Sequence, residues 1–493
     1  MTITASYNFD QYRWRRSPDD PSYYWRPVGG SELIEDIWHR YMDGEQKLFL
    51  GATLDLGIPS SATSFLARAR DAWVATRHTI PTIASRTEYA FNGRPLLAYR
   101  IPKDDVEASA WAERTVRIDI SADNLDELRV EIGKRPIPSD DGDQTFIYIL
   151  PFSDTSFGIL LFTSHVPFDG AGTKAVMNVY LGKLAQYLAD PSLVAEEAAP
   201  WGPEANQLLP FITEVLADNE PRDGPAYRDT LNKVMEDLAY TTPRLRGFKL
   251  RKLGPGATRR LGHKFSVEDT NALLAGARNA GLTLNHVAHA AMFLVTADDN
   301  PPTDETPDDA VIMNYGLVNA RCRLRAPYNK KDAYPGYCLG ASPIWVECSF
   351  IAENSHKSKR EQLLAVAACL KEQYLEQKKY PSLLSIEPEQ MDLMVGQMLS
   401  GPPPATWIGP WYSGDGRGED LLTPEHFSGS QKIIEIVDFF QSLNKTQPGP
   451  FFRAYSWRGQ LELSVDFNES AMPRDVVQRF NDQWANYIRQ IIV

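Results

Sequence analysis

The sequence predicts an α/β protein with mixed sheets, because segments with strand and helix patterns follow one another along the whole chain. Three observations lead to this prediction. Two β-rich runs at 145–150 and 157–163 are joined by a short polar turn. Amphipathic helical spacing follows over 172–188. The chain then ends with an alternating strand at 461–467 and a helix that has one apolar face.

Length and composition limit the class of protein. The chain has 493 residues, of which 43% are hydrophobic and 23% charged, which is enough apolar material for two or three domains. Its 64 acidic and 51 basic residues give a net charge of −13, so binding to nucleic-acid phosphates is not expected. No apolar run approaches the ~20 residues that span a bilayer, and the N-terminus has no apolar signal region. We therefore expect a cytoplasmic monomer without nucleic-acid or membrane partners.

Cysteine and histidine spacing indicates no metal site. Four cysteines lie in one stretch, and no two of them form a Cys-x-x-Cys pair: Cys322, Cys338, Cys348 and Cys369. Reduced, mostly buried thiols are therefore expected. His286 and His289 can share a face of one helix, but no carboxylate stands at helical spacing beside them. Core packing is the favoured interpretation of that pair.

Three segments have the composition of connectors. Residues 189–210 are rich in Pro and Ala, and residues 298–309 contain three prolines and six acids. A third predicted loop, 401–418, holds the glycines Gly414, Gly416 and Gly418. These glycines lack the strand–helix frame of a dinucleotide site.

Helix and strand signals continue in the second half of the chain. Ser266 is a predicted cap for a helix that runs through Ala280, with Gly281 following it and a buried helix over 284–295. In the C-terminal strand, apolar and polar residues alternate over 461–467. This alternation predicts a half-buried strand with its polar face toward solvent.

The segment that carries chemistry lies directly after the second β-rich run. His165 follows the strand end, Asp169 stands four residues later, and Gly170 and Gly172 open the predicted helix. Side chains at the end of a strand are available to ligands, and an imidazole titrates near neutrality, as a general base requires. A lone buried His is more often a core residue. The spacing and the strand–turn–helix context reverse that preference here and favour catalysis.

The His-x-x-x-Asp-Gly pattern resembles the signature of the chloramphenicol-acetyltransferase-like acyltransferases, which include the plant BAHD enzymes and the condensation domains of peptide synthetases. The segment 316–323 is similar to the family's second-lobe strand with its trailing Arg. Within the superfamily, the chain most resembles the fungal trichothecene 15-O-acetyltransferase-like proteins. Ser164 replaces a second His that condensation domains usually carry, and no Asp-Phe-Gly-Trp-Gly motif of BAHD enzymes is evident. These differences favour a standalone acyltransferase.

The resemblance implies a fold and roles for the residues of the motif. Two similar lobes, 1–215 with the motif and 216–493, would form a pseudo-symmetric pair with a solvent channel between them. His165 would be the base that takes the proton of an acceptor. Asp169 would point away from the channel and pair with Arg321 or Arg323, which would hold the turn in place.

A basic segment on this acidic chain is a candidate docking site. Residues 244–264 contain eight Lys or Arg and no acid. They could dock the phosphates of coenzyme A, although a solvated linker is the more common meaning of a charge run. Arg259 and Arg260 are the candidate donor-binding residues because they lie nearest the predicted second lobe.

Together these features predict an acyl-CoA-dependent O-acyltransferase, with acetyl-CoA or another acyl-CoA as co-substrate and no metal. The acceptor would be a hydroxyl of a small, fairly apolar secondary metabolite. One alternative is a condensation-like protein that forms an amide or ester from a carrier-bound thioester. Another is a non-acylating binder or cyclase on the same fold, in which His165 would be dispensable.

Overall fold

A six-stranded sheet forms the centre of the first lobe in the computed structural model, which describes residues 7–193, 200–252, 254–400 and 408–492. All neighbouring strands are antiparallel except β6 and β7. In spatial order the strands are β13 (Glu425–Ser428), β14 (Gln431–Leu443), β3 (Leu48–Leu56), β8 (Ser156–Thr163), β7 (Thr145–Ser153) and β6 (Val116–Ile118). The predicted pair of β-rich runs is therefore confirmed as β7 and β8.

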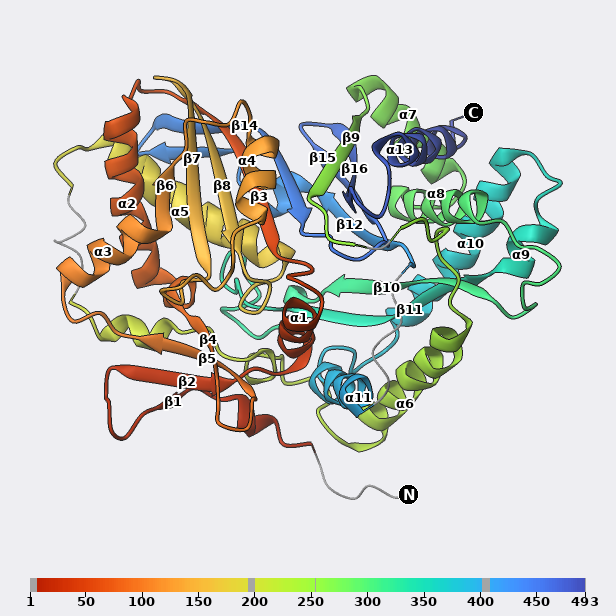
Figure 1. The fold of residues 1–493 in the computed structure, drawn as a ribbon, viewed down its shortest axis with the longest axis horizontal. Coiled ribbons are helices and arrows are strands. Elements are labelled where there is room, and N and C mark those ends of the chain that lie inside the picture. Colours follow the sequence, from red (N-terminus) through yellow and green to blue (C-terminus); the bar gives the residue numbers. More distant parts are fainter. Residues whose placement is uncertain (1–6, 194–199, 253, 401–407, 493) are drawn as a thin grey trace.

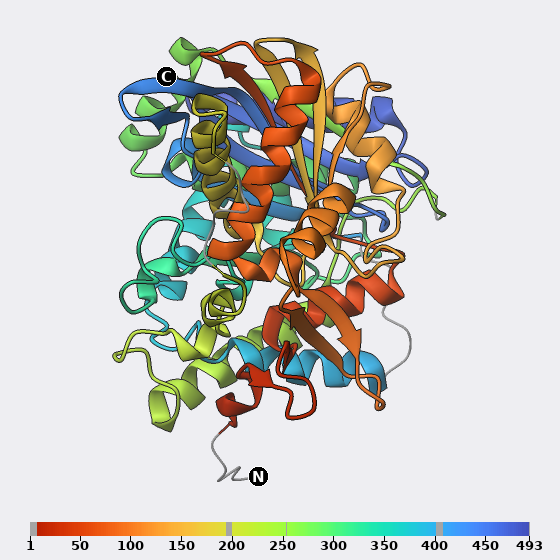
Figure 2. The same cartoon turned by 90° about the vertical axis from the view of Figure 1, so that its left-hand side faces the viewer.

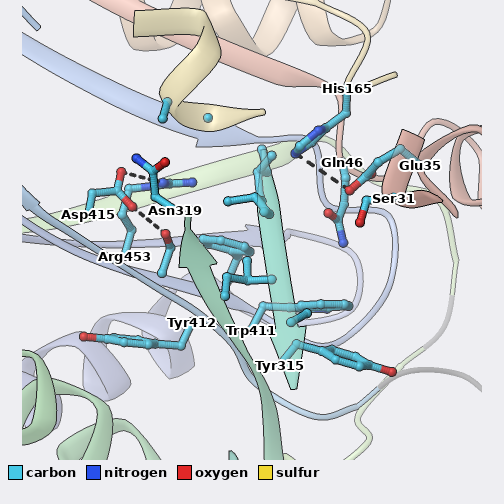
Figure 3. Close-up of a pocket in the computed structure, with 18 of the residues that line it drawn as sticks. Ser31, Glu35, Gln46, His165, Tyr315, Asn319, Trp411, Tyr412, Asp415 and Arg453 are labelled. Atoms are coloured by element: carbon cyan, nitrogen blue, oxygen red, sulfur yellow. Dashed lines mark hydrogen bonds and ion pairs between the residues drawn. The ribbon is translucent and has the colours of Figure 1, made fainter. Parts of the chain in front are cut away.

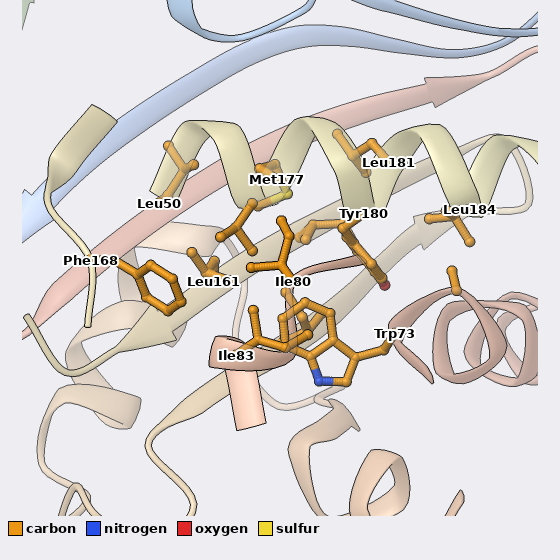
Figure 4. Packing of buried hydrophobic residues seen from close by; sticks show 14 of the residues in the cluster. Leu50, Trp73, Ile80, Ile83, Leu161, Phe168, Met177, Tyr180, Leu181 and Leu184 are labelled. Atoms are coloured by element: carbon orange, nitrogen blue, oxygen red, sulfur yellow. The ribbon is translucent and has the colours of Figure 1, made fainter. Parts of the chain in front are cut away.

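Helices cover both faces of this sheet because its strands present apolar side chains on both sides. Helices α2 (Ala62–Thr79) and α5 (Gly170–Ala189) pack against one another and against the sheet, with α3 (Asp105–Thr115) beside α2. Trp73 and Tyr180 meet in this layer (Figure 4). Helix α4 (Leu125–Gly133) packs on the opposite face. The predicted helix at 172–188 is confirmed as α5.

The second lobe has its own four-stranded sheet. Its strands, in spatial order, are β12 (Trp411–Arg417), β15 (Phe451–Trp457), β16 (Gln460–Asn468) and β9 (Thr258–Lys264). One apolar core joins this sheet to the helices α7 (Val267–Asn279), α8 (Leu284–Asp299), α10 (Lys359–Gln377) and α13 (Arg474–Arg489). The Ser266 side chain accepts from the amide of Asp269 and so caps α7, as its sequence predicts.

Smaller elements lie between and below the lobes (Figure 1). Strands β10 (Val311–Asn319) and β11 (Leu339–Glu347) form a hairpin-like pair, with the short helix α9 (Cys348–Glu353) after it. Helix α1 (Gly30–Tyr41) packs on α11 (Glu387–Ser400), near α6 (Gly224–Thr241). The last sheet has the order β1 (Arg15–Arg16), β2 (Tyr23–Pro27), β5 (Pro95–Arg100) and β4 (Arg86–Tyr89). Figure 2 shows this sheet at the end of the molecule near the N-terminus.

The second half of the chain contributes two strands to the sheet of the first lobe. Strands β13 and β14 lie far along the sequence but complete the first lobe's sheet, where β14 pairs with β3. The division of the chain into 1–215 and 216–493 stays a prediction about where the lobes separate in sequence, and β13 and β14 cross that division. Two lobes with mixed sheets confirm the predicted fold class.

The C-terminal strand differs from its prediction. Glu462, Ser464 and Asp466 were expected to face solvent, but all three are buried in β16. Asp466 accepts hydrogen bonds from the Ser442 hydroxyl (2.7 Å) and the Leu443 amide (3.1 Å) at the end of β14. The alternation is correct, but its polar face meets the other lobe instead of water.

The predicted loop at 401–418 is also partly wrong. Residues 401–407 lie outside the described residues, but Trp411–Arg417 form β12, which pairs in parallel with β15 and has an irregularity between Gly414 and Gly416. A short helix, α12 (Gly418–Leu421), follows. Local glycine content favoured a loop, whereas pairing with a distant strand provides the hydrogen bonds that stabilise an extended chain.

The basic segment and the acidic loop, which the sequence presents as separate features, pair with each other. Arg244 contacts Asp309 (2.6 Å), and Arg251 forms an ion pair with Asp299. Arg246 donates to the carbonyl of Asn300 (3.2 Å). The net positive charge of this segment is therefore partly neutralised within the chain.

All four cysteines are free. The described part of the chain contains no group of three or more His, Cys, Asp or Glu side chains that could hold a metal ion. Within that part, no single helix has the length and apolar composition to cross a membrane. Helices α7 and α8 reach that length and composition only when they are taken together, and the chain bends by 94° between them.

Candidate active site

A tight turn between β8 and α5 holds His165 at the boundary of the two lobes. The turn begins where β8 ends, and Asp169 is the N-cap of α5, with its carboxylate accepting from the Gly172 amide (2.6 Å). Gly172 is required here because a Cβ atom would lie 1.8 Å from the carbonyl oxygen of Pro335. The motif therefore fixes the backbone on the C-terminal side of His165, where α5 begins.

Asp169 lies behind the turn, outside the channel lining, and is fully buried. Both of its carboxylate oxygens accept from the Arg321 guanidinium, at 2.8 and 3.1 Å, and one of them also accepts from the Cys338 amide (2.9 Å). Of the two arginines that the sequence left open, the partner is Arg321. Arg323 instead approaches Glu220 at 3.5 Å. This bidentate pair connects the turn to the strand-end region after β10.

His165 reaches the channel between the lobes, and 10% of its side chain is exposed. Burial lowers the pKa of His165 to about 4, so its imidazole is neutral and can accept a proton at neutral pH. Its Nε2 atom lies 3.8 Å from Oε1 of Glu35 (Figure 3). The Tyr337 ring packs beside the imidazole, with 5.4 Å between ring centres.

Glu35 is a site residue that the sequence did not indicate. It lies on α1, it is 4% exposed, and it lines the channel. The hydroxyl of Tyr337 donates to its Oε1 atom (3.1 Å). Burial raises the pKa of Glu35 to about 8, although the Tyr337 hydrogen bond acts in the opposite direction. No motif or periodicity marks this glutamate, since it approaches His165 only in three dimensions.

The channel has an apolar wall and opens to solvent; together with that open part, it encloses about 1330 Å³ of empty space. Trp411 of β12 packs between Trp38 and Tyr315, at 5.3 and 5.7 Å between ring centres. Met391 and Met394 of α11 continue this wall. Aromatic and thioether groups provide a large contact surface for an apolar ring system.

A charged cluster lies on the other side of the channel (Figure 3). Asp415 of β12 bonds to the Lys174 ammonium and to the Arg453 guanidinium, each at 2.9 Å. Burial alone would raise the pKa of Asp415, but Arg453 and Lys174 hold it below its ordinary value. Burial lowers the pKa of Lys174, whereas its contact with Asp415 acts in the opposite direction. The Lys174 and Arg453 side chains line the channel and present hydrogen-bond donors to it.

Arg259 and Arg260 do not line this channel. Both lie on β9, where Arg259 pairs with Glu469 (2.6 Å) and the guanidinium of Arg260 packs over Phe440, 5.0 Å from the ring centre. Their assignment to donor binding stays a prediction. Arg259 is the first of the two to test because 39% of its side chain is exposed, whereas the guanidinium of Arg260 packs on Phe440.

If Arg259 binds a phosphate of the donor, Arg259→Ala should raise KM for acetyl-CoA by roughly 10-fold or more, with kcat unchanged, because a charge-assisted hydrogen bond contributes about 1.5–3 kcal/mol. Steady-state kinetics at low and high salt measure this effect, and thermal denaturation controls for folding. An unchanged KM would show that Arg259 does not bind the donor, and its contact with Glu469 would then be structural.

The fold and this channel define a class of protein. Two α/β lobes with a histidine delivered from a strand end into the channel between them are the architecture of the chloramphenicol-acetyltransferase-like acyltransferases. The model of the family described as 15-O-acetyltransferase Tri3 matches residues 6–377. The chain belongs to this family and is therefore an acetyltransferase.

Individual relatives agree over nearly the full length. The chain is 22% identical to trichothecene 15-O-acetyltransferase TRI3 of Fusarium sporotrichioides, with 95% of this chain and 94% of the relative covered. It is 23% identical to trichothecene O-acetyltransferase TRI3 of Trichoderma arundinaceum, with 97% and 96% covered. O-acetyltransferase pigM of Monascus ruber is 24% identical over 87% of this chain and 76% of that protein.

Solved structures show the same fold. The structure of TRI3 trichothecene 15-O-acetyltransferase from Fusarium sporotrichioides superposes with a TM-score of 0.88 at 17% identity, covering 100% of both chains. The first condensation domain of the calcium-dependent antibiotic synthetase has a TM-score of 0.63 at 13% identity and covers 94% of this chain and 95% of that one.

Proposed function

We propose that this acetyltransferase transfers an acetyl group from acetyl-CoA to a hydroxyl of a small, fairly apolar secondary metabolite, with His165 as the general base. The observation that carries the proposal is the position of the neutral imidazole of His165, which lines the channel between the lobes. The ion pair between Asp169 and Arg321 holds the turn that carries it. The names of the relatives, which act on trichothecene hydroxyls, support the same chemistry.

The reaction follows from these groups. The imidazole of His165 takes the proton of the acceptor hydroxyl as the acceptor oxygen forms a bond to the thioester carbonyl carbon. The carbon–sulfur bond of the tetrahedral intermediate then breaks, and the imidazolium returns the proton to the leaving thiolate. Lys174 and Arg453, which line the channel beside Asp415, provide hydrogen-bond donors that stabilise negative charge during these steps.

The apolar wall supports a rigid, fairly apolar acceptor. Trp38, Tyr315 and Trp411 present aromatic surface on the same side of the channel as α1, which also carries Glu35. An acceptor that packs on this wall would bring a hydroxyl toward His165. Among candidate acceptors, a trichothecene with a free 15-hydroxyl is the first to test, because the Fusarium sporotrichioides relative is named for that reaction.

The test is a mass-spectrometric screen of alcohols with acetyl-CoA as the sole donor, including a 15-hydroxy trichothecene and the same compounds with amino groups. We expect an acetylated alcohol, formed by the wild-type protein without any carrier protein. A product that forms only from a carrier-bound thioester would favour the condensation-like alternative. If no acetyl transfer occurs and acetyl-CoA does not change the thermal stability, the non-acylating binder or cyclase would replace this proposal.

Cellular location and assembly remain predictions. We propose a cytoplasmic monomer that uses acyl-CoA as a freely diffusing donor. Gel filtration with light scattering tests the monomer, and a dimer would contradict it.

A further inference from the structure

Two buried polar atoms beside the His165 ring have no hydrogen-bond partner among the described residues. They are Oε2 of Glu35 and Nε2 of Gln46. Both residues line the channel together with His165 and lie at one side of it (Figure 3). Buried polar groups are almost always hydrogen-bonded, so this cluster indicates a polar group of a ligand at this position.

The spacing of two of these side chains fits one oxygen atom. The distance of 3.8 Å between His165 Nε2 and Glu35 Oε1 is too long for a direct hydrogen bond. A hydroxyl oxygen in front of the pair can lie about 2.8 Å from both atoms at once. The Tyr337 hydroxyl, which donates to Oε1, holds the carboxyl in this orientation.

The backbone conformation of Gln46 is independent evidence for a ligand site at this position. Its backbone lies in the left-handed region with φ of 64°, which is uncommon for a residue other than glycine. The backbone N–H of Gln46 donates to the backbone carbonyl of Asn444 (2.7 Å), which fixes this conformation. Backbone strain of this kind concentrates at functional sites, and here it brings the Gln46 side chain beside Glu35.

We infer that Glu35 is a second residue that contacts the acceptor: its protonated carboxyl donates a hydrogen bond to the acceptor hydroxyl while His165 accepts the hydrogen of that hydroxyl. This inference rests on the proposed function and specifies its acceptor class. During transfer the hydroxyl proton moves to Nε2 of His165, the carbon–oxygen bond forms, and the carboxyl proton of Glu35 stays in place.

The protonation states agree with these roles. Burial keeps the pKa of Glu35 at about 8 and that of His165 at about 4, so a donor and an acceptor face each other at neutral pH. The other groups with which Glu35 interacts are the Tyr337 hydroxyl, Glu45 and Lys445. Glu45 and Lys445 form a buried ion pair with each other, so their charges oppose one another at Glu35.

This arrangement selects hydroxyls over amines. A hydroxyl oxygen has two lone pairs, so it can accept from Glu35 with one and attack the thioester with the other. An amine nitrogen has a single lone pair, which is needed for the attack. The donor role of Glu35 therefore assists transfer to oxygen and gives no assistance to transfer to nitrogen.

The experiment compares the pH dependence of kcat/KM in Glu35→Gln, Glu35→Ala and wild-type protein, with acetyl-CoA and a 15-hydroxy trichothecene or its 15-amino counterpart as acceptor. For the wild type we expect activity to fall as pH rises past about 8, because ionised Glu35 can no longer donate. Glu35→Gln, whose amide donates at every pH, should keep activity within about threefold at neutral pH and lose this alkaline limb. Glu35→Ala should lose roughly 10- to 100-fold toward the hydroxyl and much less toward the amine.

Glu387→Gln is the matched control. Burial also raises the pKa of Glu387 to about 8, but this residue bonds to the Ser31 amide and does not line the channel. It should leave the alkaline limb and the activity unchanged. Loss of the limb in Glu387→Gln instead of Glu35→Gln would overturn the inference.

A measurement without turnover separates this inference from the proposed function. Infrared difference spectra of wild type against Glu35→Gln should show a protonated carboxyl band at pH about 6 that disappears at pH about 10. An ionised Glu35 at pH about 6, or a Glu35→Gln protein as impaired as Glu35→Ala, would overturn the inference. The proposed function would instead fail if the wild type acetylated no hydroxyl at all.

Discussion

Replacement of His165 by alanine is expected to lower kcat by between about 100-fold and 10,000-fold while the protein stays folded. A positioned general base contributes rate enhancement of that order, and no other described side chain in the turn can take the acceptor proton at this position. The KM for acetyl-CoA should change little, because the imidazole acts on the acceptor side of the reaction. Initial rates of thiol release with saturating donor measure this effect.

The matched control is His426→Gln. His426 on β13 is also buried, with burial lowering its pKa to about 4, but it does not line the channel. We expect it to keep wild-type kcat. Added imidazole should restore part of the activity of His165→Ala only, since the deleted side chain leaves space beside the acceptor. Full activity in folded His165→Ala would refute the general-base role.

Replacement of Arg321 by alanine is expected to destabilise the protein by about 3–5 kcal/mol, because removal of one partner of a buried ion pair leaves the other charge unpaired. Asp169 is fully buried, and it receives both hydrogen bonds of the guanidinium fork. The turn that carries His165 depends on this carboxylate, so kcat/KM of the folded fraction should also fall. Urea denaturation and initial rates measure the two effects.

Two variants make this expectation specific. Arg321→Lys keeps the charge but cannot form the bidentate contact, so it should lie between wild type and Arg321→Ala in stability. Arg323→Ala removes a neighbouring arginine that approaches Glu220 at 3.5 Å and donates to the Tyr380 carbonyl (3.2 Å). Because Arg323 does not contact Asp169, this change should cost less stability than Arg321→Ala and leave kcat/KM of the folded protein unchanged. Equal effects at both arginines would contradict the assigned pairing.

Short-range patterns predicted much of the molecule correctly. The composition of the two β-rich runs and the polar turn between them predicted β7 and β8. The apolar spacing predicted α5, and the cap at Ser266 predicted the start of α7. The motif at His165 was recognisable because its residues lie within one turn, where spacing alone restricts the geometry. Its resemblance to an acyltransferase family is confirmed by the family match.

Other features depended on segments that are distant in sequence. The glycines of β12 predicted a loop, but this segment is a strand because it pairs with β15. Asp466 was expected to face solvent, but it is buried against the end of β14, where it accepts from the Leu443 amide. The composition of the basic segment predicted an open anion-binding site. In the structure, however, Arg251 pairs with Asp299 at the end of α8, and Arg244 pairs with Asp309 in the loop that follows. In each case the local pattern was compatible with two environments.

The sequence by itself determined the α/β class and the position of the catalytic candidate His165, and its resemblance to the acyltransferase family implied an arginine partner for Asp169. Only the tertiary structure decided that this partner is Arg321, 152 positions away, and that Glu35 faces the imidazole. The physical reason is that hydrogen bonding along the chain fixes caps, turns and periodicity locally. Ion pairs and proton-sharing groups require atoms within a few ångströms, and folding alone brings those atoms together.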